Sequence, residues 1–143
     1  RQISLHRVYY PYYSSHKSKK NRKGSLRTPF FYKGKIMDYD ELYKKIREIN
    51  IQELICGKHK ILDEMRKILP QIQQFLQILL NMKWENDIRN VVTADVTVIM
   101  NDIVSAYENE DEVLLMDTTA YGVQEYLKYF ISEELLSGNE DEE

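Results

Sequence analysis

The chain has 143 residues, with 20 basic and 23 acidic side chains and a formal net charge of −3. The chain has only five Gly and three Pro and is rich in Leu, Ile, Glu and Lys. This composition favours helices. The single cysteine excludes an intrachain disulfide, and the apolar runs are far shorter than the ~20 residues that span a bilayer, so no transmembrane segment is expected.

The net charge conceals two oppositely charged parts of the chain. Residues 1–35 contain ten Lys/Arg and no Asp or Glu, whereas residues 36–143 contain ten Lys/Arg and all 23 acidic residues. The two parts therefore carry about +10 and about −13. A cationic segment of this kind needs an anionic partner, and nucleic acid is the dense, regular anion that Lys/Arg arrays bind.

Residues 1–37 are predicted to form an extended arm. Its central part, residues 17–25, is a cationic run with no apolar anchor, which is typical of a segment that is disordered in isolation. The cations predicted to neutralise phosphates are Arg7, Lys17, Lys19, Lys20, Arg22, Lys23, Arg27, Lys33 and Lys35. The aromatic residues predicted to fix the arm in place are Tyr9, Tyr10, Tyr12, Tyr13, Phe30, Phe31 and Tyr32.

The arm is compatible with more than one kind of partner. Its aromatic side chains suit either stacking on unpaired bases or docking onto a neighbouring subunit. Alternate tyrosines that point in opposite directions favour docking between two surfaces. The cations also suit anionic lipid, but the arm has no clear amphipathic helix of useful length. A nucleic acid is therefore favoured over a lipid surface and over a tail that only aids solubility.

From Asp38 onward the apolar spacing predicts amphipathic helices. Asp38 is a candidate N-cap with Glu41 as its capping-box partner, and Gly57 is a candidate stop for this first helix. Lys58 to Trp84 carries apolar residues at spacings of three and four. Pro70 interrupts this pattern, which predicts either one kinked helix or two helices that meet there.

The second half of the chain begins with an ambiguous stretch. The β-branched density of residues 91–100 favours a strand, but a continuous apolar stripe predicts a helix from about Glu85 to Glu108. Residues 109–112 predict a turn or a helix start. The last helix is expected to have Asp117 or Thr118 as its cap and to end at Gly138.

These elements predict an all-α fold. The simplest arrangement that buries the stripes is a four- to five-helix antiparallel bundle, which carries the extended basic N-terminal arm. The predicted division of the chain is an arm at residues 1–37, a bundle at residues 38–137 and an acidic tail at residues 138–143.

Signals for catalysis and for metal binding are weak. His59 follows Cys56 by three residues, but this pair lacks the four ligands of a structural zinc site, and Cys56 is predicted to be a small buried residue near a helix end. The acids at 110–112 are expected to form a solvated turn. Asp95 is expected at the edge of its apolar stripe, because an unpaired buried carboxylate is costly. We predict no enzyme activity, no cofactor and no metal site.

The layout resembles the major capsid proteins of archaeal filamentous and rod-shaped viruses. Residues Arg1 to Lys35 match the DNA-facing arm of that family and Asp38 to Ser137 match its helical bundle, as a similarity of architecture. The resemblance implies paired subunits, as a homodimer or as a heterodimer with a homologous capsid protein, that wrap double-stranded DNA in the A-form. It also implies lattice neighbours in a helical filament and a location in the virion, after assembly in the host cytoplasm.

Together, the residues and the resemblance predict a structural DNA-packaging protein. Phosphate contacts position a protein without reading bases, so the binding is expected to be independent of sequence. Two alternatives stay open. One is a ribosomal or other RNA-binding protein with a basic extension. The other is a helical protein-interaction scaffold whose arm contacts protein and whose binding survives high salt.

Overall fold

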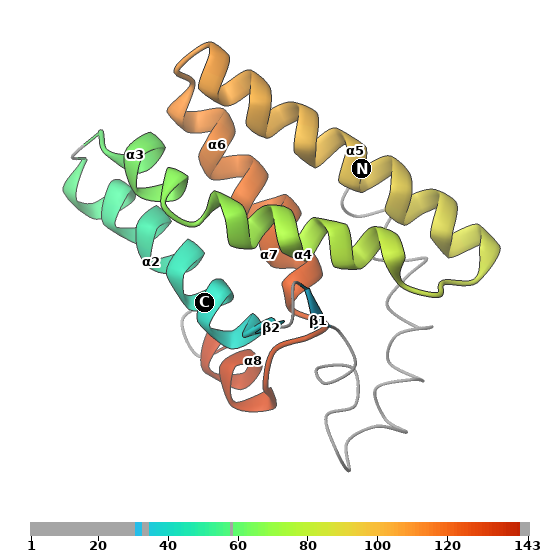
Figure 1. Ribbon diagram of the computed structural model, residues 1–143. Helices are drawn as coiled ribbons and strands as arrows, with labels where there is room; N and C mark the ends of the chain where they lie inside the picture. Colours follow the sequence, from blue (N-terminus) through green and yellow to red (C-terminus); the bar gives the residue numbers. More distant parts are fainter. Residues whose placement is uncertain (1–30, 33–34, 58, 141–143) are drawn as a thin grey trace.

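The computed structural model describes residues 31–32, 35–57 and 59–140 (Figure 1). These residues are mostly helical, which confirms the predicted all-α class. The predicted arm lies almost entirely outside them. Of its last residues, β1 (Phe31–Tyr32) and β2 (Lys35–Ile36) pair as a short antiparallel hairpin, which leads into the helical body.

Helix α2 (Tyr39–Cys56) begins and ends at the predicted residues. The side chain of Asp38 accepts a hydrogen bond from the backbone N–H of Glu41 at 3.0 Å, which satisfies one of the free donors of the first turn. The carboxylate of Glu41 pairs with Lys45 at 2.9 Å. At the other end Gly57 adopts the left-handed conformation, with φ 56°, and its N–H donates to the Glu53 carbonyl.

Pro70 lies where two helices meet rather than in a kinked helix. Helix α3 (Ile61–Arg66) ends before it, and α4 (Leu69–Asn81) holds Pro70 in its first turn. A proline is tolerated there because the first backbone N–H groups of a helix have no partner within the helix.

Residues 91–100, whose β-branched side chains also favoured a strand, are helical, as the apolar stripe predicted. Helix α5 (Asn86–Glu108) buries Val92, Val96, Ile99 and Ile103 along one face. The modest helix propensity of its β-branched residues is outweighed because this face packs against α4 and α6.

The predicted start and end of the last helix are wrong. The helix start that residues 109–112 allowed is confirmed, because the chain becomes helical again at α6 (Glu112–Thr118). It continues through the π-helical segment η1 (Thr119–Val123) into α7 (Gln124–Leu127). Asp111 is the cap, since its side chain accepts the Leu114 N–H at 3.0 Å, whereas Asp117 and Thr118 lie inside the helix. Gly138 lies within α8 (Glu133–Glu140) and does not end it.

One hydrophobic core lies among the helices, and the continuous run of α6, η1 and α7 crosses the other helices in Figure 1. Helix α2 packs against α3, η1 and α7, while α5 packs against α4 and α6. At one end the rings of Tyr39, Phe75 and Phe130 form a cluster with centroid separations of 5.0 to 5.9 Å. This cluster joins α2 and α4 to the segment that follows α7 and fixes the relative positions of the three.

Among the described helices, none is both long enough and apolar enough to cross a membrane.

Candidate functional site

The residues predicted to bind nucleic acid lie mostly outside the described part of the chain. Of the nine cations, the eight from Arg7 to Lys33 fall outside it, and Lys35 lies in β2, where it pairs with Tyr32. Of the seven aromatic residues, Phe31 and Tyr32 form β1 and the other five fall outside. The arm therefore stays a prediction, and the described residues show only where it joins the body.

A groove of about 400 Å³ lies beside this junction. The segment around the start of α2 and the first turns of α4 line it with mixed polarity. Its lining residues are Met37, Asp38, Glu41, Leu42, Lys45, Pro70, Gln71 and Gln74. Charged and amide side chains alternate there with the apolar Met37, Leu42 and Pro70, so the groove lacks the predominantly apolar lining of most small-molecule sites.

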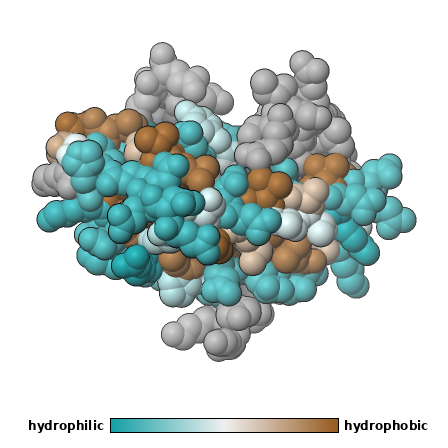
Figure 2. Space-filling view, turned by 90° about the horizontal axis from the view of Figure 1, so that it is seen from above, coloured by the Kyte–Doolittle hydropathy of each residue, from teal (hydrophilic) through white to brown (hydrophobic). Residues whose placement is uncertain are grey.

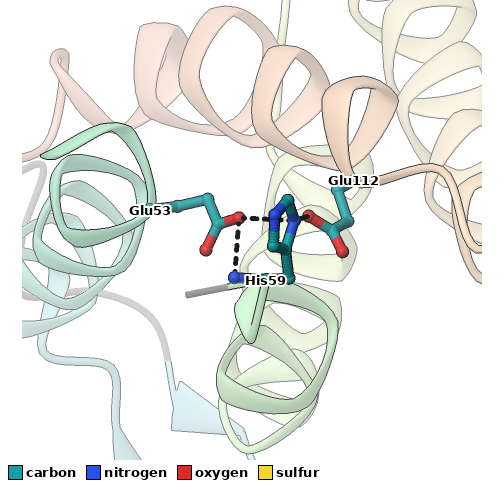
Figure 3. Close-up of side chains that lie close together, drawn as sticks. All are labelled: Glu53, His59 and Glu112. Carbon is teal, nitrogen blue, oxygen red and sulfur yellow. Dashed lines mark hydrogen bonds and ion pairs between the residues drawn. The ribbon is translucent and has the colours of Figure 1, made fainter. Parts of the chain in front are cut away.

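The cluster with the clearest chemistry lies at the other end of α2 (Figure 3). Glu53 comes from the last turns of α2, His59 from the loop before α3, and Glu112 is the first residue of α6. Nδ1 of His59 lies 3.0 Å from Oε2 of Glu112 and 3.7 Å from Oε1 of Glu53. Figure 3 shows the imidazole ring between the two carboxylates.

Glu53 is held in place by the backbone of the next helix. Its Oε1 accepts the N–H of His59 at 3.1 Å and its Oε2 accepts the N–H of Lys60 at 3.4 Å. Helix α3 has no cap from its own N-cap side chain, so Glu53 supplies one from α2. The Glu53 side chain is 9% exposed, which means that its carboxylate is oriented before any ligand arrives.

The two carboxylates change the acidity of the histidine. The hydrogen bond to Glu112, followed by the charges of Glu112 and Glu53, raises the pKa of His59 above its ordinary value. His59 is exposed and has φ 54°, in the left-handed region that a non-glycine residue rarely adopts. The loop therefore presents the imidazole to solvent while the carboxylates fix its position.

This cluster was not predicted from the sequence, which linked His59 with Cys56 instead. Cys56 is exposed, and the prediction that it is buried is wrong, because it follows the exposed Leu54 and Ile55 on the outer side of α2. Glu112 is the half-buried first residue of a helix rather than part of a solvated turn. It is 53 residues from His59, so no local spacing reveals the pair.

A buried carboxylate forms a second polar contact inside the body. Asp95 is only 8% exposed, and it accepts a hydrogen bond from the Tyr126 hydroxyl at 2.9 Å. The prediction that Asp95 lies at the edge of its stripe is therefore wrong. The phenol of α7 supplies a donor that makes burial of the carboxylate tolerable. Burial, followed by the charge of Asp95, raises the pKa of Tyr126 well above its usual range.

The π-helical segment and α7 carry further buried polar contacts. The Asn50 amide donates to the Thr119 hydroxyl at 3.0 Å, and that hydroxyl donates to the Leu115 carbonyl at 2.8 Å. The Gln124 amide donates to the Tyr43 carbonyl at 3.3 Å. These bonds tie α2 to η1 and α7, and they are typical of contacts that fix the register of packed helices.

Apolar side chains are also exposed on the body, and Figure 2 shows hydrophobic areas separated by hydrophilic ones on the face that it displays. Ile51, Leu54 and Ile55 occupy neighbouring positions near the end of α2, and Leu54 and Ile55 are 73% and 78% exposed. We call these three residues the α2 apolar face. Further exposed apolar residues are Leu80, Met100, Val104, Val113 and Tyr121.

Comparisons with known proteins do not assign a function to these features. No protein family model matches the chain, and neither a curated protein nor a solved structure is significantly similar to it. The function is therefore inferred from the charge distribution of the chain and from the surfaces described above.

Proposed function

We propose that the chain is a structural nucleoprotein that wraps double-stranded DNA with its N-terminal arm and assembles through its helical body. The observation that carries this proposal is the charge distribution. Ten cations without a single acid precede a body with 23 acidic and ten basic residues. A phosphate polyanion attracts the first part and repels the second, so the arm lies along the DNA and the body faces away from it.

The mechanism is wrapping by many weak contacts. The nine arm cations from Arg7 to Lys35 neutralise phosphates and release counterions, which makes each contact sensitive to salt. Repetition of the subunit along a filament multiplies these contacts. The aromatic residues of the arm dock against neighbouring subunits and hold the arm in place. Because phosphates carry no sequence information, the packaging is independent of sequence.

The helical body, as a four- to five-helix bundle, supplies the surface through which subunits contact one another. Ile51, Leu54 and Ile55 lie three and four residues apart, so they share one side of α2. Exposed apolar side chains at such positions are a favourable contact for another subunit. In this proposal the contact is made with a second copy or with a homologous capsid subunit, and the assembled particle is a virion.

The first test is removal of residues 1–35. The truncated protein should keep its helical circular dichroism spectrum and lose binding to a random-sequence duplex, measured by fluorescence anisotropy at low salt. Undiminished binding by the folded truncation would contradict the proposal. A variant that keeps residues 1–35 but has the nine arm cations replaced by Gln answers the same question without a truncation.

The matched control replaces exposed body cations in the full-length chain. Suitable positions are Lys44, Lys60, Lys67 and Lys83. Replacement of these four by Gln removes positive charge from the body alone, so duplex binding should stay within a few-fold of the wild-type value. A large loss in this control would mean that the body, and not the arm, binds the DNA.

The same assay separates the two alternative functions. A folded RNA that binds more tightly than duplex DNA would favour an RNA-binding protein with a basic extension. Binding to a protein partner that survives high salt would favour a scaffold. The proposal expects duplex binding that weakens steeply with salt, together with filaments in negative-stain electron micrographs of the protein mixed with linear DNA.

A further inference from the structure

We propose that Glu53, His59 and Glu112 form a Zn²⁺ site that joins the loop before α3 to the start of α6. The proposal does not depend on the arm or on the proposed function. Each residue offers one ligand atom, and the three atoms all lie within 4.8 Å of one another. They come from three separate elements, so a bound ion would connect α2, the α2–α3 loop and α6 (Figure 3).

The distances suit a tetrahedral ion. Ligand atoms at about 2.0 to 2.2 Å from a tetrahedral Zn²⁺ lie about 3.4 Å from one another. Nδ1 of His59 is 3.0 Å from Oε2 of Glu112 and 3.7 Å from Oε1 of Glu53, on either side of that value. Small side-chain adjustments therefore place all three atoms around one centre. His59 is 78% exposed, which leaves the fourth position to water.

The charges of the cluster favour a dication over a proton. Two carboxylates face one imidazole, and a proton on His59 offsets only one of the two negative charges. A Zn²⁺ ion offsets both and takes the neutral imidazole as a ligand. An imidazole nitrogen among the ligands favours Zn²⁺ over Mg²⁺ or Ca²⁺, which prefer oxygen ligands alone.

One ligand is already oriented by the fold. The carboxylate of Glu53 accepts two backbone N–H groups, from His59 and Lys60, and its side chain is nine-tenths buried. Hydrogen bonds of this kind to a ligating carboxylate fix its direction and are typical of protein metal sites. The ion would therefore require only small shifts of Glu112 and of the His59 ring, which already lie 3.0 Å apart.

The experiment is a calorimetric titration of the full-length, metal-stripped protein with ZnCl₂ at neutral pH. The wild type should bind one Zn²⁺ per chain through this site. His59→Asn should weaken that binding at least tenfold, and Asn tolerates the left-handed backbone at φ 54°. Glu112→Gln should do the same with its shape preserved. Glu53 is a poorer target because its carboxylate also caps α3.

Other Zn²⁺ ligands in the chain supply the controls. Cys56→Ser and the double variant His6→Gln/His16→Gln should retain the wild-type affinity, since none of these residues belongs to the site. Zn²⁺ should raise the melting temperature of the wild type and of these controls, but not that of His59→Asn. The proposal is overturned if the wild type shows no saturable binding. It is also overturned if both site variants bind as tightly as the wild type, or if binding is lost in either control.

Discussion

Two buried tyrosines place the same hydroxyl group in opposite environments. Tyr126 donates its hydroxyl to the buried carboxylate of Asp95 at 2.9 Å. The ring of Tyr39 packs against those of Phe75 and Phe130, and its buried hydroxyl has no hydrogen-bond partner among the described residues. Burial raises the pKa of Tyr39 to about 12. Removal of the two hydroxyls should therefore have opposite consequences for stability.

The tyrosine pair gives a matched test by urea unfolding. Tyr126→Phe removes a donor to a charged group and should lower the free energy of unfolding by about 1.5 to 3 kcal/mol. Tyr39→Phe removes a buried hydroxyl without a partner and should leave stability unchanged or raise it by about 1 kcal/mol. Each variant is the control for the other, since both lose one oxygen from a buried ring. Equal losses in the two would show that the hydrogen bond to Asp95 contributes nothing specific.

The histidine of the cluster should titrate at a higher pH than an ordinary histidine. Its pKa is raised first by the hydrogen bond to Glu112 and then by the charges of Glu112 and Glu53. Because the folded-state value is raised, the favourable contact is fully present below the ordinary pKa of about 6.5 and is lost as pH rises through the folded value. An NMR titration in the presence of EDTA should show this shift. Glu112→Gln should move the pKa back toward about 6.5, and an unchanged value would mean that Glu112 is not the main cause.

Helix limits were predictable where one strong local signal acts. Helix α2 lies between Asp38 and Gly57. The Asp38 side chain caps its first turn, and Gly57 adopts the left-handed conformation that ends it. For α6 the sequence allowed a helix start at residues 109–112 but did not decide the cap, since Asp111, Asp117 and Thr118 are all good caps. Which of them is used depends on which residues are buried, and Leu115 and Thr118 are buried in the core. That choice is made by tertiary packing, which the local sequence does not contain.

Two helical glycines differ in what surrounds them. A Cβ added to Gly122 in η1 would lie 2.9 Å from Cγ1 and 3.2 Å from Cδ1 of Ile99, a buried residue of α5. A Cβ added to Gly138 in α8 would meet nothing within 4 Å. The first glycine therefore permits the close approach of η1 and α5, whereas the second has no such role.

Alanine at these two positions should shift stability in opposite directions. Gly122→Ala should lower the melting temperature, because overpacking costs about 1 to 3 kcal/mol and outweighs the gain in helix propensity. Gly138→Ala should raise stability by up to about 1 kcal/mol, since only the propensity changes. Thermal unfolding followed by circular dichroism measures both. A stabilised Gly122→Ala variant would show that η1 and α5 have room to separate.

Over the molecule as a whole, the cationic arm could be predicted from the sequence, whereas the cluster of Glu53, His59 and Glu112 could not. The cationic arm is visible in the order of charges alone, because all ten basic residues of residues 1–35 precede the first acidic residue of the chain. The cluster of Glu53, His59 and Glu112 is invisible there, because it forms only when the α2–α3 loop meets the start of α6. Local composition thus points to a polyanion partner, while the metal ligands require the fold.

If the arm binds DNA and the body does not, the affinity for duplex DNA should depend on salt concentration in a specific way. For duplex DNA the logarithm of the binding constant falls with the logarithm of salt concentration, with a slope of about −0.9 for each phosphate neutralised. Replacement of Lys19, Lys20, Arg22 and Lys23 by Gln in the full-length chain removes four such contacts. The slope should therefore become shallower by about 3 to 4 in fluorescence anisotropy titrations over a range of salt concentrations. The same number of Gln substitutions on the body, at the four exposed lysines named above, should leave the slope unchanged. If both variants flatten the slope equally, the DNA contacts the body as much as the arm, and the separation of roles inferred from the charges would be wrong.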